Sequence, residues 1–264
     1  MITLKQLTVV LTLLLLASCG NQENKNSNEN VSTESQKITI ATAANMQFAI
    51  NELSKIFTRQ TDIECEIVIS SSGKLTAQIK EGAPYNVFVA ANMKYPQEIY
   101  NSKLTENKPK VYAYGKLVLW SMVEGIEPSL ALLEDNSIQH IALANPKTAP
   151  YGVAAMEVLN HQSIYDKVED KLVFGENVSQ TNQFITSKSA EIGFTALSVV
   201  LSPEMKGKGK WIALEDTIYS PIEQGVVVIK HNNQYNEAAM AFYDFLFCKN
   251  AQEILTNFGY AVNE

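Results

Sequence analysis

Short apolar runs alternate with amphipathic segments from about residue 37 onward. Three runs have the length and composition of buried strands: 37–41, 63–69 and 86–90. Between the first two runs, apolar residues recur every three or four positions from Met46 to Phe57, which predicts a helix. A second helix is predicted after Gly73. Strands and helices that alternate at this spacing are typical of βαβ units and a mainly parallel sheet.

The second half of the chain repeats this alternation. Its predicted strands are again short and apolar: 140–144, 171–174 and 191–194. Helices are predicted at 152–161, from Ser179, and through Val200. The lysine- and glycine-rich stretch 206–210 is expected to be a surface loop. Two amphipathic helices, 235–247 and 251–258, are predicted to close the chain.

Two longer β-rich runs flank this second series, at 111–122 and 221–229, and a glycine interrupts each of them. A strand of this length can leave one lobe and enter another. Two such crossings predict a hinged protein, in which residues 37–115 and 223–264 form lobe 1 and residues 116–222 form lobe 2. Hinged lobes close over ligands.

The N-terminal segment predicts export. Lys5, an apolar run at 7–16 and the sequence Ala17-Ser18-Cys19 resemble a bacterial lipoprotein leader, with a signal peptide at 1–18 and lipidation at Cys19. The alternative is a membrane-spanning anchor, but the apolar run is shorter than the ~20 residues that a span requires. Residues 19–36 are rich in Asn, Ser and Glu and predict a flexible tether. We therefore expect an exported protein that a lipid alone holds at a bacterial membrane.

The net charge limits the kinds of partner that the protein can bind, and the cysteine content limits the disulfides that it can form. The 264 residues include 21 basic and 28 acidic side chains, for a net charge of −7. This balance argues against a nucleic-acid partner. Besides Cys19, the chain holds only Cys65 and Cys248. Export permits a disulfide between them, and two free thiols are an equal alternative.

Four turns share one pattern. Each follows a predicted strand, is rich in small or polar residues and starts a helix: 43–45, 71–73, 146–152 and 176–179. Ligands bind at the carboxyl ends of parallel strands, and free N–H groups at helix starts attract anions. Because each lobe holds two of the turns, closed lobes would direct four helix starts at one small anion. Backbone N–H groups, the Asn45 amide and the Ser72 hydroxyl would be the donors.

Each of these residues also has a plainer interpretation. Asn45 and Ser179 are residue types that commonly cap helices. Tyr151 can simply pack within its lobe, and Val178 can offer no more than its backbone N–H. Lys74, beside the second turn, is expected to point to solvent rather than to the rim of the cleft.

Motifs for catalysis are not found. The three histidines are isolated, without the spacing of metal ligands, and neither a nucleophile elbow nor a phosphate-binding loop is present. The sequence therefore predicts a binding protein rather than an enzyme, without a cofactor. An exported enzyme with an unobvious site and an adhesive surface lipoprotein remain alternatives of other classes.

The turns and their flanks resemble those of the molybdate-binding proteins of bacterial ABC transporters. The matching stretches are 38–45, 70–79, 82–89, 115–121, 145–153 and 238–260. The resemblance implies an α/β fold of the two-lobed periplasmic-binding-protein type (type II), with mainly parallel sheets flanked by helices and two hinge crossings. It also implies an oxyanion held by neutral groups, without direct protein–metal ligands. The implied ligand-binding residues are Ala44, Asn45, Ser72, Tyr151 and Val178.

The chain departs from the family at two positions. Ala44 offers only its N–H where many members have a hydroxyl, and Ala196 lies near the place of a cleft tyrosine, part of whose role Tyr151 can take. The resemblance implies a protein that captures molybdate or tungstate, without a preference between the two that the sequence gives, and delivers the anion to an ABC permease. A binding protein for sulfate, phosphate or a small organic acid is the alternative. A monomer is the plain expectation.

Overall fold

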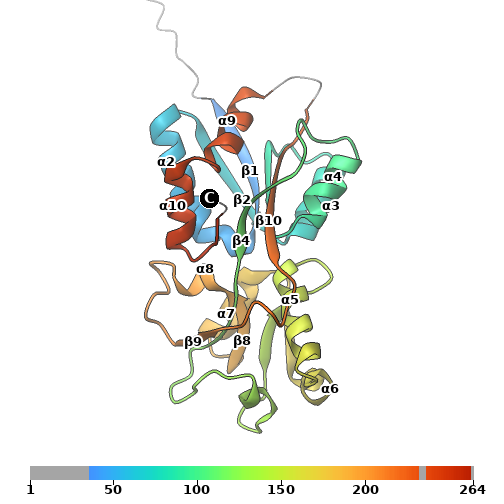
Figure 1. Cartoon of the computed structure of the whole chain (residues 1–264), viewed down its shortest axis with the longest axis vertical. Coiled ribbons are helices and arrows are strands. Elements are labelled where there is room, and N and C mark those ends of the chain that lie inside the picture. Colours follow the sequence, from blue (N-terminus) through green and yellow to red (C-terminus); the bar gives the residue numbers. More distant parts are fainter. Residues whose placement is uncertain (1–35, 232–235, 263–264) are drawn as a thin grey trace, which may run out of the picture. The chain divides into compact units, whose positions relative to one another are not determined.

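The computed structural model describes residues 36–231 and 236–262 (Figure 1). The predicted signal peptide at 1–18, the lipidation site Cys19 and all but the last residue of the tether lie outside the described residues. Within the described part, no helix is both long enough and apolar enough to cross a membrane.

The first sheet has the strand order β2-β1-β3-β10-β4. Its strands are β1 (Lys37–Ala43), β2 (Glu64–Ser70), β3 (Val87–Ala90), β4 (Lys110–Gly115) and β10 (Ile222–Val228). Strand β1 pairs in parallel with β2 and β3, whereas β10 pairs antiparallel with β3 and β4. This sheet is therefore parallel where the βαβ units lie and antiparallel where the chain returns from the other sheet.

Helices cover both faces of this sheet (Figure 1). They are α2 (Gln47–Thr61), α3 (Ser72–Lys80), α4 (Lys94–Asn101), α9 (Glu237–Phe245) and α10 (Lys249–Asn257). Phe57 of α2 packs against Phe242 and Phe245 of α9, over the strand residues Ile38 and Ile40. On the opposite face, α3 and α4 form a separate cluster with Phe88.

The second sheet repeats the design, with the order β7-β6-β8-β5-β9. Its strands are β5 (Leu117–Ser121), β6 (Ile141–Ala144), β7 (Leu172–Gly175), β8 (Ile192–Ala196) and β9 (Lys210–Ala213). Strand β6 pairs in parallel with β7 and β8, and β5 pairs antiparallel with β8 and β9. The helical segments of this part are α5 (Pro150–His161), α6 (Tyr165–Val168), α7 (Val178–Thr186), α8 (Leu197–Val200), η2 (Ala131–Glu134) and η3 (Glu169–Lys171).

The chain passes twice between the two sheets. The first passage is Lys116, between β4 and β5, and the second lies between β9 and β10. The two-lobed α/β fold is thus confirmed. The sheets, predicted to be mainly parallel, are each mixed, with two parallel and two antiparallel pairings. The lobe limits 37–115, 223–264 and 116–222 stay a prediction, because the folded part packs as one unit.

Several elements were not expected from the sequence, among them α4, α6 and β9. Helix α4 contains Pro96, which discourages a helix prediction, but proline is tolerated in the first turn of a helix. Strand β9 follows the predicted lysine-rich loop and is exposed along its whole length, so it lacks the apolar alternation that marks a strand. The predicted helix 235–247 begins at Glu237, because the Asn236 side chain caps it by accepting the Ala239 N–H at 2.9 Å.

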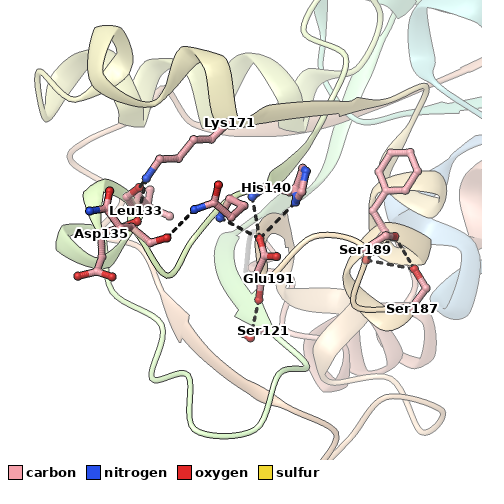
Figure 2. Close-up of polar contacts among 11 residues, drawn as sticks. Ser121, Leu133, Asp135, His140, Lys171, Ser187, Ser189 and Glu191 are labelled. Atoms are coloured by element: carbon pink, nitrogen blue, oxygen red, sulfur yellow. Dashed lines mark hydrogen bonds and ion pairs between the residues drawn. The ribbon is translucent and has the colours of Figure 1, made fainter.

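A polar cluster fastens one end of the second sheet (Figure 2). The Glu191 carboxylate, just before β8, accepts the backbone N–H groups of Gln139 at 3.1 Å and His140 at 2.7 Å, just before β6. The Ser121 hydroxyl at the end of β5 donates to the Glu191 carbonyl at 2.6 Å. Glu191 therefore ties together the ends of three strands.

Candidate functional site

A small cavity lies between the two sheets, where all four predicted turns meet. The residues that line it are Ala43, Ala44, Asn45, Ser71, Ser72, Ala91, Ala149, Pro150, Tyr151, Asn177 and Val178. All five residues predicted as anion ligands are among them, and none of the five is more than 3% exposed. The structure thus brings the predicted residues together, while their role as ligands stays a prediction.

The sequence places a helix start at each turn. Ala44 and Asn45 open the short helix η1 (Ala44–Met46) after β1, and Ser72 opens α3 after β2. Tyr151 is the second residue of α5, after β6, and Val178 opens α7, after β7. N–H groups in a first helical turn have no intrahelical acceptor, and they carry the positive end of the helix dipole. None of these four first turns contains an acidic residue that would compete for an anion.

Ser71 and Ser72 are adjacent but have different roles. The Ser71 hydroxyl is the cap of α3 and accepts the Lys74 N–H at 3.4 Å. The Ser72 hydroxyl accepts the N–H of Ala91, at the end of β3, at 3.0 Å. A hydroxyl that already accepts still has one proton to give. The Ser72 proton is therefore available to a guest in the cavity.

The side chain of Asn45 is held by other side chains of the protein. Its Nδ2 group donates one hydrogen bond to the Gln224 Oε1 atom and one to the Tyr260 hydroxyl, both at 2.9 Å. An amide nitrogen has only two protons. In this arrangement both amide protons are taken and the Asn45 Oδ1 atom has no partner among the described residues, so the role of the amide as an anion donor stays a prediction.

The plainer interpretation of Asn45 and Ser179 as helix caps is wrong. No side chain caps η1, and the cap of α7 is Asn177, which accepts the Gln180 N–H at 3.1 Å. The Ser179 hydroxyl instead donates across the lobes to the Gln47 side chain. Ser179 thus belongs to the contact between lobes.

Tyr151 lies with its hydroxyl against Gly115, at the first passage between the lobes, where a Cβ atom would collide with it. The hydroxyl is buried, and the polar side chain of Asn45 lies close to it. Burial raises the pKa of Tyr151 well above its ordinary value, and nearby Tyr260 and Tyr112 raise it further. The Asn45 side chain beside it lowers this pKa only in part, so Tyr151 is a neutral hydroxyl.

Charged side chains stand outside the cavity, because every residue that lines it is neutral. Lys74 is about half exposed, and its ammonium group pairs with Glu176 of the other lobe. The expectation that Lys74 points away to solvent is wrong, since it spans the rim between the lobes. Nearby, the Gly73 N–H donates to the Thr148 carbonyl at 2.9 Å, which adds a second contact across the rim.

The arrangement suits a small anion better than a cation or a reaction. Backbone N–H groups converge from four helix starts, and hydrogen bonds from such groups to an oxyanion are about twice as strong as neutral ones. The cavity lining holds no carboxylate, histidine or lysine that could transfer a proton. Within the described residues, no three His, Cys, Asp or Glu side chains are grouped as metal ligands, and Cys65 and Cys248 are both free thiols.

Comparison with known proteins identifies the family. The family model described as bacterial extracellular solute-binding protein matches residues 38–261. The chain belongs to this family. It is 34% identical to the molybdate-binding protein ModA of Rhodobacter capsulatus over 225 residues, which cover 85% of this chain and 88% of that protein. It is also 34% identical to ModA of Azotobacter vinelandii over 232 residues, or 87% of this chain and 91% of that protein.

A solved structure agrees with this membership. The periplasmic molybdate-binding protein of Azotobacter vinelandii superposes on this solute-binding protein with a TM-score of 0.81 and 33% identity. The superposition covers 86% of this chain and 100% of that one. The family and the two-lobed fold therefore rest on both sequence and structure.

Four residues of this solute-binding protein that shape the site were missed by the sequence analysis. Ala91 holds the Ser72 hydroxyl, while Gln224, Tyr260 and Ser198 hold Asn45. Of these four residues, Gln224 was the one that the sequence could best have revealed, because a polar residue within the mostly apolar run 221–229 is unusual. It is fully buried, beside an irregularity in the pairing of β10 with β4.

Proposed function

We propose that this protein captures molybdate or tungstate between its lobes and delivers the anion to an ABC permease. The observation that carries the proposal is the neutral cavity, into which all five predicted residues converge from four helix starts. The relatives named for molybdate binding support it over nearly the full chain. The ligand is an oxyanion whose metal atom is bonded to its own oxygens, so the protein supplies only hydrogen-bond donors.

The two lobes share the donors between them. Lobe 1 offers the N–H groups of Ala44, Asn45 and Ser72 with the Ser72 hydroxyl, and lobe 2 offers the N–H groups of Tyr151 and Val178. An anion that satisfies both sets binds the closed form better than the open one. Capture therefore favours closure, and release requires the permease to favour the open form.

Selectivity is expected to come from size and donor placement rather than charge. Molybdate, tungstate and sulfate all carry two negative charges, so the net charge of the site cannot separate them. Residues from the ends of four elements line the cavity, and we expect a smaller tetrahedral anion to leave some of the donors out of reach. A buried donor without an acceptor costs about 1–3 kcal/mol.

We also propose that the chain is exported as a monomer, cleaved before Cys19 and anchored through lipid at that cysteine. The lipoprotein-like leader and the polar stretch 19–36 support this. The test is membrane fractionation of the full chain and a Cys19→Ala variant. The wild type is expected in the membrane fraction and the variant in the soluble exported fraction. Identical partition of both would contradict the anchor.

Isothermal titration calorimetry of the purified protein tests the ligand. Sodium molybdate, tungstate, sulfate and phosphate are titrated separately at neutral pH. We expect molybdate and tungstate to bind at micromolar concentration or below, and sulfate and phosphate to bind at least 100-fold more weakly. Absence of molybdate binding at micromolar concentration would overturn the proposal, and tight sulfate or phosphate binding would favour the alternative ligand.

A further inference from the structure

Behind the cavity, three hydrogen bonds form a ring that starts and ends at Asn45. The Asn45 Nδ2 atom donates to the Tyr260 hydroxyl at 2.9 Å, and the Tyr260 hydroxyl donates to the Ser198 Oγ atom at 3.1 Å. The Ser198 hydroxyl donates to the Asn45 backbone carbonyl at 2.8 Å. All three residues are almost completely buried.

We propose that Ser198 is a positioning residue, which holds Asn45 in its anion-binding geometry only while the lobes are closed. The inference rests on the proposed function, since it assigns a role in anion retention to a residue that lies outside the cavity lining. Ser198 of lobe 2 thereby positions an anion donor, Asn45, that belongs to lobe 1.

The number of protons on the two hydroxyl groups supports these assignments of donor and acceptor. Tyr260 has one proton, and its two acceptors within reach are the Ser198 Oγ atom and the Asn45 carbonyl, each at 3.1 Å. For the Ser198 proton, the Asn45 carbonyl is the acceptor at 2.8 Å. With the protons assigned in this way, each hydroxyl both accepts and donates. Such chains polarise one another, so that loss of one member weakens the rest.

The ring joins parts of the chain that belong to different lobes. Tyr260 belongs to the C-terminal segment that lobe 1 holds, because Ala261 exchanges two backbone hydrogen bonds with Tyr114 of β4. Ser198 belongs to α8, directly after β8 of the second sheet. Separation of the lobes would withdraw Ser198 from Asn45 and leave the carbonyl with Tyr260 alone.

Gln224 fixes the same residue from a third side. Its Oε1 atom accepts the other Nδ2 proton of Asn45, and Gln224 lies on β10, which follows the second passage between the lobes. Asn45 is therefore held through both its side chain and its carbonyl, while its N–H is left for the anion. The hydrogen bond from Ser198 is the one that forms when the lobes close and breaks when they open.

The experiment compares substitutions within one short stretch of lobe 2. Ser198→Ala removes the hydroxyl, and Ser198→Thr retains it. Ser202→Ala is the matched control, because Ser202 is also fully buried and near α8, but its hydroxyl has no partner among the described residues. Association and dissociation of sodium molybdate are measured by stopped-flow fluorescence, and melting temperatures are recorded with and without molybdate.

Loss of one neutral hydrogen bond from the closed form is expected to speed molybdate dissociation about fivefold. We expect Ser198→Ala to show this change with an association rate within about twofold of wild type, and a smaller molybdate-induced rise in melting temperature. Ser198→Thr should restore the wild-type dissociation rate. Ser202→Ala should match wild type in both rates and in the molybdate-induced rise in melting temperature. A dissociation rate of Ser198→Ala equal to that of Ser202→Ala would overturn the proposal.

A purely structural role would give a different pattern, in which Ser198→Ala lowers both melting temperatures equally and leaves dissociation unchanged. This result would also overturn the proposal. If Ser198→Ala does not fold, Tyr260→Phe removes the ring's middle hydroxyl and is expected to speed dissociation in the same direction. A wild-type protein that does not bind molybdate overturns the proposed function, whereas normal wild-type binding with unaltered variants overturns the ring alone.

Discussion

The backbone N–H of Ala91 donates to the Ser72 Oγ atom at 3.0 Å, and so determines which way the Ser72 proton can point. Ala91 follows β3, the strand beside β1, whereas Ser72 opens α3. The bond occupies one lone pair of the hydroxyl and leaves its proton for the cavity. A serine that would otherwise rotate freely is thereby prepared as an anion donor before the anion arrives.

The first prediction concerns this donor. Ser72→Ala removes one hydrogen bond to a charged group, which corresponds to roughly a 10- to 100-fold loss of molybdate affinity. It also leaves the Ala91 N–H buried without an acceptor, so some loss of stability is expected. Calorimetric titration with sodium molybdate measures the affinity.

Ser71→Ala changes the neighbouring serine, which also lines the cavity but has the role of capping α3. It removes the cap of α3, which is expected to cost about 1 kcal/mol of folding free energy, measured by urea denaturation. Molybdate affinity should change far less than in Ser72→Ala. Equal losses of affinity in the two variants would place the anion away from the Ser72 hydroxyl.

The strands, helices and turns that could be predicted are those that a pattern within a short stretch of sequence marks. Strand β6 and the turn that leads to Tyr151 are marked by an apolar run, a proline and a helix start, all within a dozen residues. The contact of Asn45 with Tyr260 joins positions 215 residues apart, and no local pattern indicates it. The sequence therefore predicts which turns form the site. It does not predict which side chains have their hydrogen-bonding groups occupied by other residues of the protein.

The second prediction concerns Asn45. Asn45→Asp replaces the two Nδ2 donors by a carboxylate oxygen, which cannot bond the Gln224 Oε1 atom. The new negative charge also lies at a buried position beside a doubly charged guest. Molybdate affinity is expected to fall at least 100-fold at neutral pH by calorimetry. Undiminished affinity would place the anion elsewhere.

Asn182→Asp separates the charge effect at the site from the general cost of a buried carboxylate. Asn182 is also buried, but it lies on α7 outside the cavity, where its Oδ1 atom accepts the Thr195 hydroxyl at 2.5 Å. This variant is expected to lose stability while retaining molybdate affinity within about fivefold. A loss as large as that of Asn45→Asp would show that stability alone explains both variants.

The third prediction concerns acid sensitivity in the second sheet. Burial raises the pKa of Glu191, but the backbone N–H groups of His140 and Gln139 outweigh it, so the pKa lies below its ordinary value (Figure 2). A carboxyl group with a lowered folded-state pKa stabilises the fold above its unfolded-state pKa of 4.5. This stabilisation is lost as the pH falls below that value and through the folded-state pKa.

Glu191→Gln tests this linkage, because a glutamine can still accept the two N–H groups without titrating. The variant is expected to melt at a lower temperature than wild type at pH 7, and the difference should shrink as the pH falls below 4.5. Thermal denaturation followed by circular dichroism between pH 7 and pH 3 measures it. A constant difference across this range would contradict the role of Glu191 ionisation.

The fourth prediction tests whether the site needs a cation. Lys74 is the ammonium group that pairs with Glu176 at the rim, and both side chains are close to half exposed. Exposed ion pairs contribute about 0–1 kcal/mol, and high salt screens them. Lys74→Gln is therefore expected to weaken molybdate binding by less than about fivefold, with Glu176→Gln giving a change of similar size. Calorimetric titrations in low and high salt compare both variants with wild type. If Lys74→Gln alone lost affinity 100-fold, the anion would be held by a formal positive charge, and binding by neutral groups would be refuted.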